Sequence, residues 1–267
     1  TDPAMIGPLL AGGVDAVFAD PASRDPTAAR RADGTARRET DPRRWSPPWP
    51  AIAALTERVP RVVAKLAPGV SRDIAPGWEL VWTSVDGDLV EAAAWSPALA
   101  RPGVARAAVV VDTRTGTALE LTDADDPYGE GVRGGLAPTG QVGAVLLEPD
   151  AAVIRAGLVG ALVARTGGHL LDPRLAYLTT DTLPTAVGVT GAARAFAVLD
   201  VGSTDTARLR AALGRLGAGD VVVKTRGVQV DPAAVRRSMR LRGRGRTLVV
   251  LLARVDSGAL AIVADPL

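Results

Sequence analysis

The last third of the chain carries the most constraining pattern, a regular alternation of short apolar runs with amphipathic segments. Runs rich in valine and leucine predict strands, and the segments between them have helical spacing. The predicted order is strand, helix, strand, helix, strand, strand, over residues 195–199, 205–216, 221–225, 231–240, 246–253 and 259–263. Asp231 followed by Pro232 predicts the start of the second helix, because an acid caps it and proline suits its first position. This order predicts a small α+β sandwich with helices on one face of a sheet.

The middle of the chain reads as hairpins and one long helix. Asp86-Gly87-Asp88 separates apolar runs at 79–85 and 89–95, which is a strong signal for a tight hairpin. A second hairpin is expected over 105–121, around Thr115-Gly116. Residues 142–147 predict another strand. We expect one helix to follow from Asp150 to Gly167, with an apolar stripe of Val153, Ile154, Leu158 and Leu162.

The beginning of the chain predicts a pair of parallel strands. Val14, Ala16 and Phe18 alternate in a run that predicts a short buried strand, which stops at Asp20-Pro21 because proline cannot donate to a ladder. A second run, 62–66, ends in Ala67-Pro68-Gly69, and a helix is expected between the two runs at 49–60. A βαβ unit makes neighbouring parallel strands. Ligands bind outside the carboxyl ends of such strands, so Asp20 lies where a ligand is expected.

The chemistry that this edge offers is limited. No Ser/His/Asp set, catalytic carboxylate pair or phosphate-loop lysine accompanies Asp20. A lone carboxylate suits holding an amino group or positioning a nucleophile rather than hydrolysis. Lys65, at the end of the next strand, is either a second site residue or an edge residue with its ammonium in water. The arginine-rich loop 25–48 is either solvated or a lid, and its Trp45, with the adjacent Trp49, either anchors the loop or stacks on a base.

The residues from 224 to 254 are strongly basic, with nine cations and one acid, a net charge of +8. Eight of the cations are candidate RNA-binding residues: Lys224, Arg226, Arg236, Arg237, Arg240, Arg242, Arg244 and Arg246. Arginine forks bind phosphate in two-pronged fashion. We interpret the glycines between the last arginines as making the backbone of this run flexible. The alternative is a solvated helix face and a charged loop, with Arg226 paired to Asp231.

Composition excludes several classes of function. The chain of 267 residues has no cysteine and a single histidine, so it lacks disulfides, cysteine-ligated metals and a thiol nucleophile, and we expect no metal. No apolar run reaches the ~18 residues of a membrane span, and no signal peptide opens the chain. We therefore expect a cytoplasmic protein without a membrane partner.

Six stretches together resemble bacterial class I S-adenosylmethionine (SAM)-dependent methyltransferases of actinobacterial type, which carry a C-terminal THUMP-like domain. They are FADPASR (18–24), VAKLAPG (63–69), SVDGDLVEAAAWSP (84–97), EPDAAVIRAGL (148–158), LDPRLAYLT (171–179) and KTRGVQVDP (224–232). The resemblance covers almost the whole chain and matches the C-terminal two-thirds of such an enzyme. It implies an α/β fold in three parts: a partial Rossmann-like methyltransferase domain at 1–122, a ferredoxin-like linker at 141–190 and a THUMP-like α+β domain at 191–267.

The resemblance also implies site residues and a cofactor. Asp20-Pro21-Ala22 corresponds to the Asp/Asn-Pro-Pro motif beside the methyl acceptor, with Ala22 in place of the second proline. Asp20, Pro21 and Lys65 are then the catalytic candidates, and Asp20 is also the candidate contact to SAM. The glycine-rich motif that holds SAM in this family has no counterpart before Asp20, so we expect this chain alone not to bind SAM tightly.

Two functions remain open from the sequence. The first is a SAM-dependent methyltransferase acting on RNA, with the THUMP-like module binding the substrate. The second is a non-catalytic RNA-binding module. A third reading, a partner protein that associates through an open sheet edge, follows from the unpaired edge expected beside the first strand.

Overall fold

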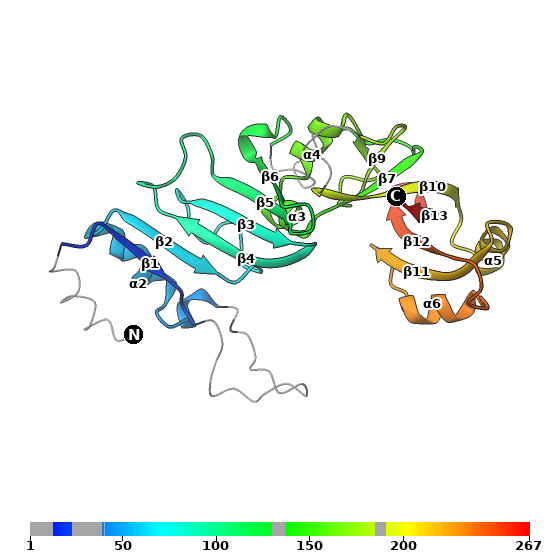
Figure 1. Cartoon of the computed structure of the whole chain (residues 1–267), viewed down its shortest axis with the longest axis horizontal. Coiled ribbons are helices and arrows are strands. Elements are labelled where there is room, and N and C mark those ends of the chain that lie inside the picture. The colour runs from blue at the N-terminus through cyan, green and yellow to red at the C-terminus, as the bar shows by residue number, and fades with distance from the viewer. Residues whose placement is uncertain (1–12, 23–38, 40, 130–136, 185–190) are drawn as a thin grey trace. The chain divides into compact units, whose positions relative to one another are not determined.

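The computed structural model describes residues 13–22, 39, 41–129, 137–184 and 191–267, which form two compact units (Figure 1). The first unit comprises residues up to Asp125 together with Ala151–Leu158. The second comprises Asp126–Asp150 and Val159–Leu267. Each unit is built around its own sheet.

The sheet of the first unit is mixed, with strand order β1-β2-β4-β3-β5-β6. Its strands are β1 (Ala16–Ala19), β2 (Arg61–Leu66), β3 (Glu79–Val85), β4 (Asp88–Trp95), β5 (Arg106–Asp112) and β6 (Thr117–Thr122). β1 pairs with β2 and β3 with β5 in parallel, whereas β4 and β6 run antiparallel to their neighbours. The helical segments of this unit are η1 (Pro42–Arg44), α2 (Trp49–Ala54), η2 (Leu55–Glu57), η3 (Asp123–Asp125) and α3 (Ala151–Ala156). α3 packs against β3 and β5.

The local predictions for this unit are confirmed where turn chemistry decides them. Asp86 and Gly87 both have positive φ, 52° and 86°, which is the conformation of the type I′ turn expected between β3 and β4. The second hairpin joins β5 to β6. The parallel pairing of the first two strands is also confirmed, with Phe18 opposite Val63.

The prediction that the first strand is buried is wrong. The side chain of Phe18 is 68% exposed, and Val14 is exposed as well. β1 lies at the end of the strand order and has β2 as its neighbour within the described residues. Alternation of apolar residues predicts a strand with two distinct faces, but it does not tell whether another element covers either face.

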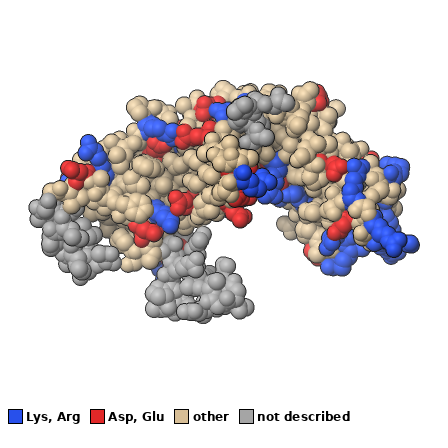
Figure 2. All heavy atoms as spheres, viewed as in Figure 1, with Lys and Arg blue, Asp and Glu red and all other residues tan. Residues whose placement is uncertain are grey.

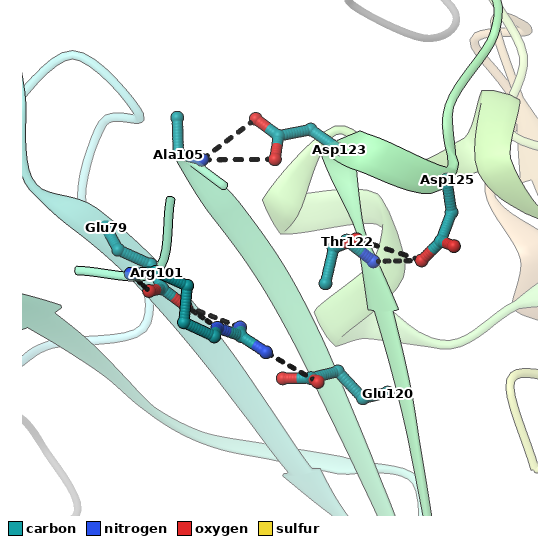
Figure 3. A network of polar contacts seen from close by, with 7 residues as sticks. All are labelled: Glu79, Arg101, Ala105, Glu120, Thr122, Asp123 and Asp125. Carbon is teal, nitrogen blue, oxygen red and sulfur yellow. Dashed lines mark hydrogen bonds and ion pairs between the residues drawn. The ribbon is translucent and has the colours of Figure 1, made fainter. Parts of the chain in front are cut away.

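A polar network fixes the connection from β4 to β5 (Figure 3). The Glu79 carboxylate, on β3, is 4% exposed and accepts the backbone N–H of Arg101 at 2.8 Å and its Nε–H at 2.9 Å. The other end of this guanidinium donates to Glu120 on β6 at 2.7 Å. Asp123 accepts the backbone N–H of Ala105 at 3.1 Å. The connection is therefore held at Arg101 by carboxylates of β3 and β6, and at Ala105 by the carboxylate of Asp123 in η3.

The sheet of the second unit has the order β11-β12-β13-β10-β7-β9-β8. Its strands are β7 (Val145–Pro149), β8 (His169–Leu170), β9 (Leu178–Thr180), β10 (Ala193–Gly202), β11 (Ala218–Arg226), β12 (Arg246–Val255) and β13 (Gly258–Pro266). Its helices are α4 (Val159–Thr166), α5 (Thr206–Arg215) and α6 (Pro232–Ser238). The predicted order of strands and helices in the last third is confirmed element by element. The segments predicted as separate, 141–190 and 191–267, share this sheet because β7 pairs with β10.

Two groups of buried side chains lie on the two faces of this sheet. One group contains Leu209 and Leu213 of α5 and Met239, which follows α6, so both helices cover the same face, as predicted. The other group contains Leu146, Tyr177, Phe196, Leu251 and Ile262, and lies on the opposite face. Residues that alternate with the helix-facing ones along β11, such as Lys224, therefore point toward the second group.

The single helix predicted from Asp150 to Gly167 is wrong. It is broken into α3 and α4 at Gly157, whose φ of 72° lies in the left-handed region that favours glycine. A side chain at this position would meet the guanidinium groups of Arg72 and Arg106. Arg106 also donates to the carbonyl of Ala156 at 3.2 Å, which satisfies an acceptor at the end of α3. Apolar spacing continues across the break, so the pattern alone could not show it.

Asp172 provides a test of the packing in the second unit. Its carboxylate is 1% exposed and accepts three hydrogen bonds from Arg174, one from the backbone and two from the guanidinium, at 2.8–2.9 Å. These bonds lower the pKa of Asp172 to about 2. Because the folded pKa lies below the unfolded one, the stabilisation is complete above about pH 4 and is lost as the pH falls through 2.

We therefore expect Asp172→Asn to lower the free energy of unfolding by about 2 kcal/mol at pH 7. The difference between wild type and variant should shrink between pH 4 and pH 2, because the wild-type carboxylate then becomes protonated. Thermal or urea unfolding over a pH series measures this. A difference that stays constant down to pH 2 would show that the charge of Asp172 does not contribute.

Candidate functional site

The structure brings two of the predicted catalytic residues together at the carboxyl end of β1 and β2. Lys65 Nζ lies 3.9 Å from the Asp20 Oδ2 and 3.9 Å from the Glu91 Oε2 of β4. All three side chains are partly exposed, Asp20 by 61%. At this separation and exposure the ion pairs contribute little to stability, and the carboxylate of Asp20 keeps its acceptor capacity toward a ligand.

Pro21, the third catalytic candidate, is buried and follows Asp20 directly after the end of β1. The next residue, Ala22, exchanges two backbone hydrogen bonds with Ser46, at 2.8 and 3.2 Å. The arginine-rich loop thus leaves and rejoins the fold directly beside Asp20. Trp45 is 4% exposed and donates its indole N–H to the carbonyl of Glu39, which confirms its reading as an anchor.

Most of the arginine-rich loop, residues 25–38 and 40, lies outside the described residues, so the lid interpretation of that part stays a prediction. The described end of the loop is paired. Arg43 binds Asp41 at 2.9 Å and Arg44 binds Glu39 at 3.3 Å. Trp49 packs edge to face on Trp78, with ring centroids 5.3 Å apart.

The predicted RNA-binding residues of the second unit divide into two groups. Five of the eight pair with carboxylates. Apart from Asp231, these carboxylates lie outside residues 224–254, so the net charge of +8 does not include them. Arg236 pairs with Asp220 at 2.5 Å, Arg246 with Asp265 at 2.6 Å, Arg237 with Asp231 at 3.6 Å, and Lys224 and Arg226 pair with Glu148 at 2.6 and 3.5 Å. Asp231 also caps α6, and the cation that pairs with it is Arg237. The suggested pair between Arg226 and Asp231 is therefore wrong, because Arg226 pairs with Glu148.

The other three predicted residues, Arg240, Arg242 and Arg244, have no hydrogen bond or ion pair through their side chains among the described residues, and all are exposed. They lie between α6 and β12, and Figure 2 shows basic side chains gathering over the part of the second unit that contains α5 and α6. The backbone at Gly245 is closely packed rather than loosened. A side chain at Gly245 would lie 2.4 Å from the carbonyl oxygen of Gly217. Gly245 thus lets two loops touch while the arginines project.

A charged cluster on the other face of the second sheet was missed by sequence reasoning. Glu148 is the last residue but one of β7 and lies on the same face of the strand as Leu146, and its side chain is 13% exposed. It accepts hydrogen bonds from the Tyr177 hydroxyl and the Lys224 ammonium, each at 2.6 Å. The guanidinium of Arg226 lies over the Tyr177 ring, with its central carbon 5.4 Å from the ring centroid. The signal in the sequence was an acid that continues the apolar run of β7 and a lysine within the apolar run of β11.

The protonation states of this cluster are set by the contacts. Burial by itself raises the pKa of Glu148, but hydrogen bonds from Lys224 and Tyr177 outweigh it, and the pKa lies below its ordinary value. Burial and the bond to Glu148 raise the pKa of Tyr177 well above its ordinary range. At neutral pH Glu148 is therefore an anion and Tyr177 a neutral donor.

The comparisons with known proteins agree with both halves of the expected resemblance. A family model described as THUMP domain-like matches residues 193–266, which are β10 to β13 with α5 and α6. Two proteins of Mycobacterium tuberculosis, from strains CDC 1551 / Oshkosh and ATCC 25618 / H37Rv, are 38% identical over 206 residues, and both are named as uncharacterized S-adenosylmethionine-dependent methyltransferases. The match covers 76% of this chain and 52% of each relative, so the chain spans about half the length of the curated relatives it matches.

The fold also has a solved counterpart. A crystal structure of a proposed methyltransferase from Porphyromonas gingivalis W83 superposes with a TM-score of 0.69 at 15% identity. It covers 98% of this chain and 62% of the other one. The mixed α/β fold with a THUMP-like C-terminal part is thus as expected. In the part of the chain that the structure describes, no helix is long and apolar enough to cross a membrane, and no three acid, histidine or cysteine side chains are grouped to hold a metal ion.

The exposed geometry of Asp20 predicts that its removal leaves the fold intact. Asp20→Ala should change the free energy of unfolding by less than about 0.5 kcal/mol, because its one ion pair among the described residues is long and exposed. Urea unfolding followed by circular dichroism measures this. A loss of more than about 1 kcal/mol would show that Asp20 is a structural cap at the end of β1 and not a residue free to meet a ligand.

Proposed function

We propose that this chain is part of a SAM-dependent methyltransferase that acts on RNA, and that its second unit binds the RNA. The observation that carries the proposal is that the THUMP-like match and the exposed arginines fall in the same segment of the chain. The THUMP-like match at 193–266 spans the segment in which Arg240, Arg242 and Arg244 project without partners among the described residues. The similarity to proteins named as SAM-dependent methyltransferases supports the reaction.

The first unit offers a place for the chemistry at the carboxyl end of β1. Asp20 fits a contact to SAM or to the acceptor, because its carboxylate is exposed and, within the part of the chain that the structure describes, pairs only with Lys65, at 3.9 Å. SAM, when bound, supplies the methyl group. Asp20 would accept a hydrogen bond from the acceptor and orient it, Lys65 would add a donor at the same edge, and buried Pro21 would fix the backbone that follows. Methyl transfer depends mainly on such positioning.

The second unit offers arginines rather than aromatic side chains on its basic surface. Guanidinium groups bind phosphates, so the proposed contacts are to the RNA backbone and depend on shape rather than on base sequence. An RNA substrate also favours the cytoplasm as the place where the enzyme works. We therefore assign substrate binding first to Arg240, Arg242 and Arg244, which have no carboxylate partner among the described residues.

RNA affinity should therefore depend steeply on salt through these residues. Changing Arg240, Arg242 and Arg244 together to serine should flatten the slope of log affinity against log salt by about 2, since each phosphate contact on a single strand contributes roughly 0.7. Fluorescence anisotropy with a labelled oligoribonucleotide over a salt series measures the slope.

A matched control removes the same charge elsewhere. Arg58, Arg61 and Arg114 are exposed in the first unit, and their triple change to serine should flatten the slope by less than about 0.7. Equal effects of the two triple variants would mean that the RNA responds only to net charge. That result would overturn the assignment of RNA binding to the segment between α6 and β12.

Activity tests the other half of the proposal. In the whole product of the gene that encodes this sequence, Asp20→Ala should abolish methyl transfer from labelled SAM to total cellular RNA, with RNA affinity unchanged. Glu91→Ala is the control, because Glu91 contacts the same lysine at the same 3.9 Å, and this variant should keep turnover within a few-fold. Undiminished turnover in Asp20→Ala would refute the catalytic assignment. RNA binding without any methyl transfer by the wild type would favour a non-catalytic RNA-binding module.

A further inference from the structure

The cluster around Glu148 contains one cation in excess. The carboxylate is shared by Lys224, at 2.6 Å, and Arg226, at 3.5 Å, so the shorter and stronger pair is with lysine. Lys224 is also the better shielded of the two cations, with 22% of its side chain exposed against 44% for Arg226. Lys224 therefore acts as the counter-ion of Glu148. The charge of Arg226 remains available to solvent.

The guanidinium of Arg226 is held in a defined orientation. It lies over the ring of Tyr177, 5.4 Å from the centroid, and one of its N–H groups donates to the carbonyl of Thr225 at 2.9 Å. The ring itself cannot turn away, because Tyr177 is 1% exposed and its hydroxyl donates to Glu148 at 2.6 Å. Glu148 thus fixes the aromatic surface on which Arg226 rests.

Arg226 retains unused donors. A guanidinium carries five N–H groups. Within the described residues the hydrogen-bond acceptors of its guanidinium are the carbonyl of Thr225 and, at 3.5 Å, the carboxylate of Glu148. The remaining N–H groups belong to the exposed part of a planar cation whose orientation is restricted by the Tyr177 ring and by the bond to Thr225. Binding therefore costs this side chain less entropy than it costs arginines that project freely into solvent.

We infer that Arg226, held over the Tyr177 ring and backed by Glu148, is a preformed site for a phosphate group of the RNA, and that Lys224 is the counter-ion of Glu148 rather than an RNA contact. This inference rests on the proposed RNA binding and adds the residue that binds with a fixed geometry. It also separates Arg226 from Arg240, Arg242 and Arg244, which attract phosphate through charge.

A substitution that keeps the charge tests geometry alone. Arg226→Lys retains the positive charge but loses the planar fork and the stacking, so RNA affinity should fall roughly 3- to 10-fold. The slope of log affinity against log salt should stay the same. The slope should fall by about 0.7 in Arg226→Met, which removes the charge.

Arg215→Lys is the matched control, because Arg215 is an exposed arginine of α5 that also has a carboxylate, Asp200, at 3.5 Å. In this variant RNA affinity should stay within twofold. Binding is measured by anisotropy with labelled oligouridylate and with a mixed-sequence oligoribonucleotide that contains guanine. Circular dichroism melts establish that the variants are folded, and Tyr177→Phe, which keeps the ring, provides a second folded variant that should retain most of the affinity.

Each outcome decides a separate statement. Failure of the wild-type chain to bind either RNA overturns the proposed function and the phosphate site with it. RNA binding with equal effects of Arg226→Lys and Arg215→Lys overturns the phosphate site and leaves the proposed function standing. A loss confined to the guanine-containing RNA overturns the assignment to phosphate, because the fork would then recognise a base edge. Equal loss on both RNAs supports the site.

Discussion

The carboxylate of Glu148 joins two strands that lie far apart in the order of the second sheet. In a flat sheet β7 and β11 would be separated by four strand spacings, roughly 19 Å, which the side chains of Glu148 and Lys224 cannot span. Their contact at 2.6 Å requires the sheet to coil around the apolar group that contains Leu146, Leu251 and Ile262. The positions of Tyr177 and Arg226 follow from the same contact.

Pairing with carboxylates of neighbouring elements also explains which cations are free. Carboxylates outside the basic segment, Glu148, Asp220 and Asp265, pair with cations inside it. The strong positive charge counted along residues 224–254 is therefore reduced in space. What remains is a smaller set of exposed guanidinium groups at one part of the unit, and the electrostatic argument for RNA binding rests on that set rather than on the total.

Sequence reasoning succeeded where local chemistry decides structure. The Asp86-Gly87 turn, the capped start of α6 and the alternation of the last third could be predicted because turn geometry, capping and burial period act over a few residues. It failed where a decision depends on distant partners. The exposure of Phe18 depends on what covers the edge strand, and the break at Gly157 depends on arginines from elsewhere in the first unit. The neutralising partners of the basic segment were invisible for the same reason.

The candidate sites divide in the same way. Asp20 and Lys65 could be placed at one sheet edge because parallel strands bring their carboxyl ends together, and the structure places them 3.9 Å apart. The position of the Tyr177 ring beneath Arg226 could not be predicted from the sequence, because their contact depends on the coiling of the whole sheet. Local rules therefore located the proposed catalytic edge, whereas tertiary packing defines the proposed phosphate site.

Covalent footprinting of arginines tests the central claim most directly, that the RNA lies on the cations left available by this pairing. The chain is treated with an arginine-specific dicarbonyl reagent with and without saturating single-stranded RNA, and modification rates are read by mass spectrometry. We predict that RNA slows modification of Arg226, Arg240, Arg242 and Arg244 and leaves Arg58, Arg61 and Arg114 unchanged. Unchanged rates at the first four, with protection of the arginines of the first unit, would contradict the account.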